Sequence, residues 1–219
     1  MQILIDIFLR LDTHLANVIA QYGVWTYALL FVVLFCETGL VITPFLPGDS
    51  LLFAAGTFAA SGALDLLTLL VLLIFAAILG DTVNYWIGRR IGTSIITHGK
   101  FFRIKINPKH LERTHRFYDK YGAKTIVLAR FMPIVRTFAP FVAGVGQMHY
   151  KTFFVYNVVG GALWVALFTL GGYFFGNLPA VQHNFTFIIL AIIAISFMPP
   201  IIEFLRQNQQ KKSRPLDRT

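Results

Sequence analysis

The sequence predicts an all-α polytopic membrane protein, an inverted repeat with two opposed re-entrant hairpins and about four full transmembrane spans. Of the 219 residues, 56% are hydrophobic and 13% are charged, whereas a water-soluble domain carries roughly 25% charged residues. No Asp, Glu, Lys or Arg occurs between Thr152 and Ile202, and one helical crossing needs only ~20 apolar residues. Two further apolar segments, 35–56 and 128–146, each contain two prolines, which predict broken helices.

The first predicted elements are a span and a hairpin. Residues 13–36 contain no Asp, Glu, Lys or Arg, and at 1.5 Å per residue this length crosses a hydrocarbon core of ~30 Å. In residues 35–56, two prolines, three glycines and two acids interrupt the apolar sequence. Broken backbone is tolerated at membrane depth only where it is buried in protein or lines a wet cavity. We therefore expect a re-entrant hairpin that leaves the membrane by the side it entered.

A second span and a surface helix follow. Residues 66–88 contain a single charge, Asp81, and are predicted to cross the membrane. The span ends beside Arg89 and Arg90, which mark a cytoplasmic exit under the positive-inside rule. Residues 107–122 then predict a basic helix that lies along the inner membrane surface.

The second half repeats this order. Residues 128–146 are again apolar and broken by prolines, and they carry Arg130 and Arg136 where the earlier hairpin carries acids. We expect a second re-entrant hairpin here. Residues 152–176 and 185–205 fit two further spans.

We expect one integral membrane domain over residues 1–205, with a first half at about 13–92, a second half at about 111–176 and a final span at about 185–205. A basic cytoplasmic tail, 206–219, follows, and both termini are predicted to be cytoplasmic. An internal repeat supports the two halves, because Ala55-Gly56, Tyr85 and Gly88 recur 88 positions later as Ala143-Gly144, Tyr173 and Gly176. Inverted repeats with broken helices are typical of transporters.

The net charge of +9 is local, since ten of the nineteen basic residues lie between Arg89 and Lys124. Basic residues beside membrane spans favour contact with anionic phospholipids rather than nucleic acid. His98, His110 and His115 lie near this stretch without cysteines or a dense acid cluster, so we expect no metal site and no cofactor. The hydrolase and nucleotide-binding motifs GxSxG, HExxH and the Walker loop are missing, and we expect no enzyme and no catalytic residue.

Four ionisable residues lie in the broken apolar segments: Glu37, Asp49, Arg130 and Arg136. A charge at the centre of a membrane costs roughly 2.5 to 3.5 kcal/mol, so such residues pair with one another or line a polar pathway. One interpretation is a purely structural set of salt bridges. In the other, the two arginines bind a lipid phosphate through their planar forks, while Glu37 and Asp49 serve proton coupling.

A second set of residues ranks below these four. For Asp81, Asn84 and Tyr85 we expect a contact with lipid headgroups first, since Tyr85 can anchor at headgroup level, and a role in the transport pathway second. Gly48 would allow a tight turn or a close backbone approach. Thr137, beside Arg136, completes this set.

Three motifs together carry a family resemblance: FCETGLVITPFLPGDSLLFAAG, GDTVNYWIGRRIG and RFMPIVRTFAPFVAG. They resemble the DedA family of bacterial inner-membrane proteins, which is related to the eukaryotic SNARE-associated Golgi proteins. The resemblance implies a multi-pass protein of the inner membrane with two facing re-entrant loops. It also implies transport of lipid phosphates, chiefly the recycling of undecaprenyl phosphate to the cytoplasmic face, in some members driven by the proton motive force. The essential acids of the family correspond to Glu37 and Asp49, and its essential arginines to Arg130 and Arg136.

The leading functional hypothesis is therefore a lipid-phosphate flippase whose partners are undecaprenyl phosphate, anionic phospholipids and protons. A proton-coupled antiporter of small cations or drugs is the main alternative, in which the arginines have only a structural role. A general phospholipid scramblase or a lipid-organising protein without transport is the second alternative. The sequence leaves a homo-oligomer open.

Overall fold

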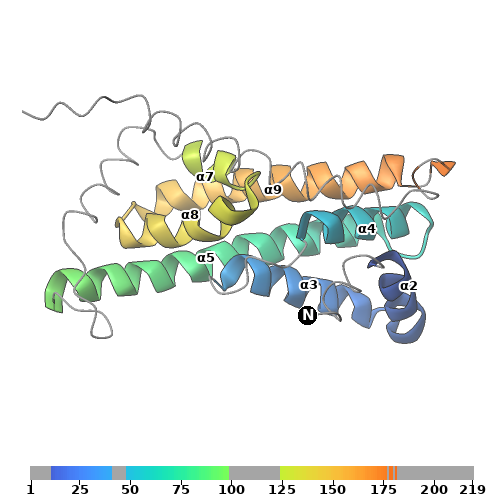
Figure 1. Cartoon of the computed structure of the whole chain (residues 1–219), viewed down its shortest axis with the longest axis horizontal. Coiled ribbons are helices and arrows are strands. Elements are labelled where there is room, and N and C mark those ends of the chain that lie inside the picture. The colour runs from blue at the N-terminus through green and yellow to red at the C-terminus, as the bar shows by residue number, and fades with distance from the viewer. Residues whose placement is uncertain (1–10, 41–47, 99–123, 177, 180, 182–219) are drawn as a thin grey trace, which may run out of the picture.

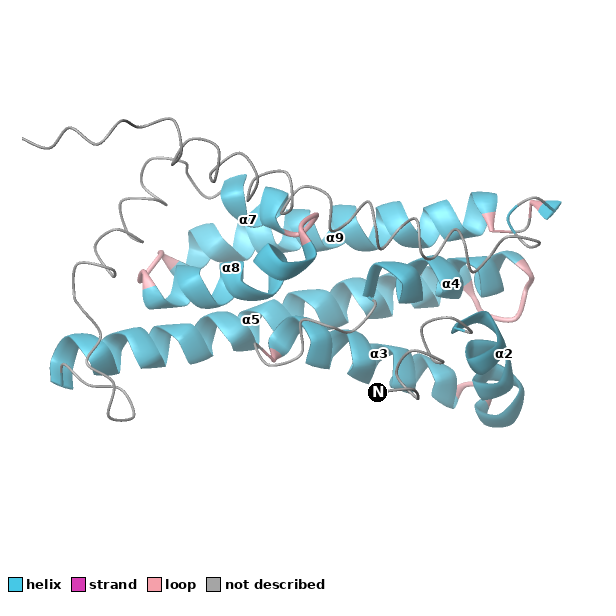
Figure 2. Cartoon of the chain, viewed as in Figure 1, coloured by secondary structure: helices cyan, strands magenta, loops and turns pink. Residues whose placement is uncertain are grey.

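The computed structural model describes residues 11–40, 48–98, 124–176, 178, 179 and 181. The predicted basic helix at 107–122, the final span at 185–205 and the tail at 206–219 lie outside these residues. Within the described residues all regular structure is helical (Figures 1 and 2). The helices are α2 (Leu11–Tyr22), α3 (Trp25–Gly39), α4 (Gly48–Ala60), α5 (Leu66–His98), α7 (Lys124–Ala129), α8 (Pro133–Val145) and α9 (Tyr150–Phe175).

Two long apolar helices, α5 and α9, pack against each other and run antiparallel along the long axis of the molecule (Figure 1). The apolar stretches Leu66–Ile91 and Tyr150–Phe175 each contain 26 residues. At 1.5 Å per residue each exceeds a hydrocarbon core of ~30 Å. Both are thus long and apolar enough to cross a membrane, as predicted from sequence.

Three shorter helices, α3, α4 and α8, begin or end near the middle of the molecule (Figure 1). Helix α3 runs from one end to the middle, and α4 returns to that same end, while α8 runs from the middle to the opposite end (Figure 1). Helix α3 ends at Gly39 because Leu40 is extended, with φ −104° and ψ 118°. Before α8, Met132 is extended and Pro133 occupies the first turn, where proline is tolerated because its missing N–H has no helical partner.

Each half of the chain packs a short helix on the long helix of the other half: α4 packs on α9, and α8 packs on α5. In both pairs, glycines let the backbones approach closely, as small residues do between membrane helices. A Cβ added at any of four glycines would lie 1.9 to 2.2 Å from a carbonyl oxygen of the facing helix: Gly56 against Thr169, Gly172 against Phe53, Gly144 against Tyr85, and Gly88 against Phe141. Gly172 thus makes the backbone contact that the 88-residue repeat would give to Gly176, one turn later. Gly176 also lies against α4, since a Cβ there would be 2.0 Å from Oγ1 of Thr57.

Most of the described core lies where α3, α4, α5 and α9 meet. Its fully buried side chains include Leu34, Leu52, Leu73 and Trp164. A smaller cluster lies around Tyr85 and is covered by α7, α8 and α9. Buried polar and charged side chains also lie between the helices, in addition to these two apolar clusters.

The predicted single span over residues 13–36 is wrong. The chain forms two helices here, α2 and α3, because Gly23 has a φ of +53°. This left-handed conformation is readily adopted by glycine and ends the first helix. The absence of charge therefore identified an apolar segment but not its continuity.

Asp65 caps the first turn of α5 and is exposed. Its Oδ2 accepts a hydrogen bond from the backbone N–H of Thr68 at 2.7 Å, and its own backbone N–H donates to the hydroxyl of Tyr27 at 2.6 Å. Hydrogen bonds from the side chain and the backbone of Thr68 lower the pKa of Asp65 below its ordinary value. Because the folded-state pKa is depressed, the ionised cap contributes stability at neutral pH that is lost as the pH falls through that pKa.

We expect Asp65→Ala to lower the thermal unfolding midpoint of the purified protein at pH 7, because the Thr68 N–H loses its acceptor. The difference from the parent protein should narrow below about pH 4, where the parent also loses the ionised cap. Thermal unfolding followed from pH 3 to pH 7 measures both effects. Asp65→Asn keeps a capping oxygen and is the control. Its unfolding midpoint at pH 7 should lie between those of the parent and Asp65→Ala. Equal midpoints for Asp65→Ala and the parent at pH 7 would contradict this role.

Candidate functional site

The first group of buried charges forms around Arg136 of α8. Its Nη1 donates to Oδ1 of Asp49, and its Nη2 donates to Oε1 of Glu37. Glu37, Asp49 and Arg136 are only 2%, 8% and 7% exposed. The guanidinium group thus bridges two carboxylates that come from two different helices, α3 and α4.

The ends of α3 and α4 place the two acids. Glu37 lies in the last turn of α3, and Asp49 lies in the first turn of α4, where the helix dipole favours a negative charge. A Cβ on Gly48 would lie 2.1 Å from Oε2 of Glu37. The predicted close approach at Gly48 is therefore present, and it is an approach to the Glu37 carboxylate.

The second group forms around Arg130, which lies between α7 and α8. Its Nη2 donates to Oδ2 of Asp81 and to Oδ1 of Asn157, each at 2.5 Å. Asn157 is held in turn, because its Nδ2 donates to the backbone oxygen of Ile78 at 3.1 Å. Arg130, Asp81 and Asn157 are all buried. This group links α5, α9 and the turn before α8.

Trp164 of α9 lies between the two groups. Its ring centroid is 4.7 Å from the guanidinium carbon of Arg136 and 5.9 Å from that of Arg130, both within the range of a cation–π interaction. Its Nε1–H donates to Oδ1 of Asp49 at 2.9 Å. The five charged residues Glu37, Asp49, Asp81, Arg130 and Arg136 are called the buried charge cluster below.

Asn84 of α5 joins the first half of the chain to the second. Its Nδ2 donates to the backbone oxygen of Thr38 at 3.1 Å and to the backbone oxygen of Thr137 at 2.8 Å. Thr38 is the residue after Glu37, and Thr137 is the residue after Arg136. Asn84 thus fixes the backbone beside both partners of one ion pair.

Tyr85 is completely buried. Its hydroxyl donates to the backbone oxygen of Met148 at 2.5 Å and accepts from Nη1 of Arg89 at 2.8 Å. Its ring stacks on Phe153 with the centroids 4.5 Å apart. The side chain therefore ties α5 to the turn before α9.

The headgroup contact predicted for Asp81, Asn84 and Tyr85 is wrong, since the three side chains are 3%, 0% and 0% exposed. Residues at i, i+3 and i+4 share one face of a helix, and this face of α5 also carries Gly88, which lies against Phe141 of α8. The face is turned into the protein because α8 covers it.

Asn157 and Trp164 were not among the predicted residues. Asn157 gave a signal, because it is a polar amide within the charge-free run that begins at Thr152, and such residues in membrane helices bond to neighbouring helices. Trp164 gave none. A tryptophan in an apolar helix is equally typical of packing and of anchoring at the membrane surface.

The buried charge cluster holds three carboxylates and two guanidinium groups. When all five are ionised, one negative charge is in excess. The Nε atoms of Arg130 and Arg136 are buried and have no hydrogen-bond partner among the residues that the structure describes. The cluster therefore has both a charge and hydrogen-bond donors that its internal pairs do not satisfy, and buried groups of this kind favour a proton or a polar ligand.

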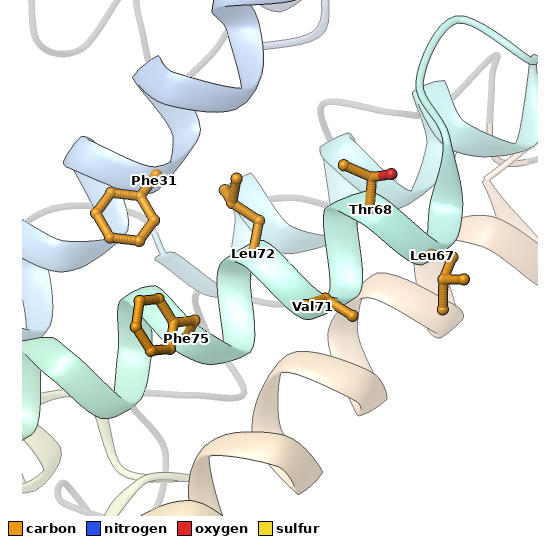
Figure 3. A pocket seen from close by; sticks show the side chains of 6 residues that line it. All are labelled: Phe31, Leu67, Thr68, Val71, Leu72 and Phe75. Carbon is orange, nitrogen blue, oxygen red and sulfur yellow. The ribbon is translucent and has the colours of Figure 1, made fainter.

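An apolar pocket of about 490 Å³ lies between α3 and α5, apart from the charges. Figure 3 shows Phe31 of α3 facing Phe75 across the pocket, with the other lining side chains along α5. The pocket is lined by Phe31, Leu67, Thr68, Val71, Leu72 and Phe75, none of which is charged. Apart from the hydroxyl of Thr68, it offers hydrocarbon contacts.

The chain is similar to known membrane proteins. Residues 46–174 match the VTT domain. The chain is 54% identical over 210 residues to Protein DedA of Escherichia coli strain K12, covering 94% of each chain. It is 42% identical over 191 residues to an uncharacterized membrane protein of Mycobacterium tuberculosis, covering 85% of this chain and 82% of the relative. It is 32% identical over 188 residues to the inner membrane protein YghB of E. coli K12, covering 84% and 82%.

No solved structure matches the chain. The VTT match covers more than half of the sequence and includes Asp49, Asp81, Arg130 and Arg136. The relatives cover most of the chain at well above 30% identity, and α5 and α9 are long and apolar enough for a membrane. This chain therefore belongs to the DedA family of membrane proteins with a VTT domain.

Proposed function

We propose that this protein transports a lipid phosphate across the bacterial inner membrane, with undecaprenyl phosphate as the substrate and the cytoplasmic leaflet as its destination. The observation that carries the proposal is the pairing of two buried arginines with acids from other helices. An arginine fork binds carboxylate and phosphate through the same pair of N–H donors. Arg136 therefore holds two carboxylates in a manner that a phosphate group can replace.

The charges of the cluster support proton coupling as part of this proposal. With all groups ionised the excess is one negative charge, which repels a phosphate. Protonation of both Glu37 and Asp49 turns this into one excess positive charge, which a phosphate monoanion neutralises. Coulomb interactions are strong in a medium of low dielectric constant, so phosphate entry and proton uptake are expected to occur together. The proposal involves no covalent reaction of the lipid.

The same proposal includes the topology. We take α3 with α4, and α7 with α8, as two re-entrant hairpins that open to opposite sides of the membrane. The equivalent glycine contacts of α4 on α9 and of α8 on α5 support an inverted repeat. Movement of one hairpin against the other would expose the cluster to each side in turn. A final span at 185–205 completes the predicted set.

Basic residues support the orientation of these hairpins. Arg90, near the C-terminal end of α5, and Lys151, at the start of α9, are both exposed. At the other end, Asp65 is an exposed acid. Since basic residues favour the cytoplasmic side, we assign the end with Arg90 and Lys151 to the cytoplasm.

A flux assay tests the proposal. Purified protein in proteoliposomes should move undecaprenyl phosphate faster than protein-free vesicles do, and a pH gradient should change that rate. A fluorescent phosphatidylcholine with a short chain is the control lipid and should not move. Movement of both lipids would favour a general scramblase instead. Absence of any lipid flux with correctly folded protein would contradict the proposal and favour the proton-coupled antiporter.

A further inference from the structure

Trp164 is completely buried and contacts both groups of the buried charge cluster. We propose that it is a positioning residue for the lipid phosphate: its N–H orients Asp49, and its ring holds the guanidinium groups of Arg130 and Arg136 towards one shared anion. This inference rests on the proposed function. It adds a residue on α9 to a site whose predicted residues all lie on other elements.

Such a residue is needed because, in the proposed mechanism, a phosphate replaces the carboxylates that Arg136 binds. When Glu37 and Asp49 are protonated, the Arg136 guanidinium loses the two carboxylates that fix its orientation. Arg130 and Arg136 then carry like charges in a medium where charges interact strongly. The electron-rich face of an indole attracts guanidinium groups and stacks on their planes. Trp164 is already placed against both groups, so it can hold them while the carboxylates change state.

Several ionisable groups surround this ring, and they come from each element that packs near it. The N–H of Trp164 contacts Asp49, a group proposed for proton exchange, whereas its ring contacts the two arginines proposed to bind phosphate. Changes to the N–H and to the ring should therefore affect proton exchange and binding differently. The groups in contact with Trp164 are Asp49 of α4, Arg130 before α8 and Arg136 of α8; Asp81 of α5 is connected through Arg130, and Glu37 of α3 through Arg136.

Two substitutions separate the two roles. Trp164→Phe keeps an aromatic ring but removes the N–H that favours the ionised carboxylate of Asp49. We expect the pH profile of flux to move to higher pH by roughly half a unit or more, with the half-saturating concentration of undecaprenyl phosphate within about twofold to threefold of the parent value. Trp164→Leu also removes the ring, and the half-saturating concentration should rise roughly tenfold or more.

Fluorescence gives a direct test that does not depend on transport. The chain contains three tryptophans, and Trp25 and Trp86 are 72% and 44% exposed and outside the cluster. The double variant Trp25→Phe/Trp86→Phe therefore leaves the emission of Trp164 alone. Vesicles containing undecaprenyl phosphate should change that emission, and vesicles containing undecaprenol, which has the same chain without the phosphate, should not.

The outcomes separate the inference from the proposed function. Parent protein that gives no flux, together with an unchanged Trp164 emission, would overturn both. Normal parent flux with an unchanged emission, or a Trp164→Leu protein with the parent half-saturation and pH profile, would overturn the positioning role alone. A folded Trp164→Leu protein that loses flux without a change in half-saturation or pH profile would also overturn it, because a merely structural role predicts that result. The full set of expected shifts would support it.

Discussion

Replacing Arg136 with lysine is expected to reduce the flux of undecaprenyl phosphate roughly tenfold to a hundredfold. Lysine keeps the charge but lacks the planar fork, so it cannot reproduce the two N–H donors that Arg136 directs at Asp49 and Glu37. Loss of one charge-assisted hydrogen bond costs about 1.5 to 3 kcal/mol, which corresponds to this range of rates. Flux in proteoliposomes at equal protein content measures the effect.

Arg90→Lys is the matched control, because Arg90 lies on α5 and is exposed; it should leave the flux within about twofold. Arg136→Ala goes further and removes the arginine partner of two buried carboxylates, which costs about 3 to 5 kcal/mol of stability. Its thermal unfolding midpoint should therefore fall, whereas that of the lysine variant should stay closer to the parent. Full flux in Arg136→Lys would exclude phosphate binding by the fork and favour the antiporter.

A single methyl group on Gly172 should destabilise the protein strongly. A Cβ at this position would lie 1.9 Å from the backbone oxygen of Phe53, and a backbone atom cannot move aside without separating α9 from α4. Overpacking of this kind costs about 1 to 3 kcal/mol or more. We expect Gly172→Ala to lower the thermal unfolding midpoint by roughly 5 to 10 °C in detergent.

The neighbouring Gly171 supplies the control. A Cβ there would meet its nearest atom, Cδ2 of Phe53, at 4.0 Å, which is an ordinary contact. Gly171→Ala should be neutral or slightly stabilising, because alanine favours a helix by up to about 1 kcal/mol over glycine. Similar midpoints for the two alanine variants would show that α4 and α9 do not depend on this close contact.

The sequence by itself determined the elements that follow from composition and local chemistry. The apolar length of residues 66–88 and 152–176 predicted the long helices, and α5 and α9 confirm them. The prolines and glycines of residues 35–56 and 128–146 predicted interrupted helices, and α3 ends at Gly39 while α8 begins at Pro133. The prediction is wrong for Pro140, which lies inside α8 and does not end it. Helix breaks depend on the backbone sterics of a few neighbouring residues, and span length depends on the thickness of the hydrocarbon core. Both can therefore be predicted from a short stretch of sequence.

The same reasoning identified four members of the charge cluster. A charge in an apolar segment needs a partner whatever the fold is, so Glu37, Asp49, Arg130 and Arg136 were predicted from cost alone. Continuity of the first span was not determined by composition. It depended on the left-handed backbone of Gly23, and an apolar stretch gives no sign of that conformation.

Only the tertiary structure decided which groups pair. Arg136 meets Asp49 across 87 positions of sequence and Glu37 across 99, and Trp164 meets Asp49 across 115. Such contacts depend on how each helix is rotated and on which helix covers it. The burial of Asp81 shows this directly, because its own helix could equally have turned that face to lipid headgroups. The residue type predicts the free-energy cost of burying a charged side chain. The packing of helices that are distant in sequence determines which partner offsets that cost.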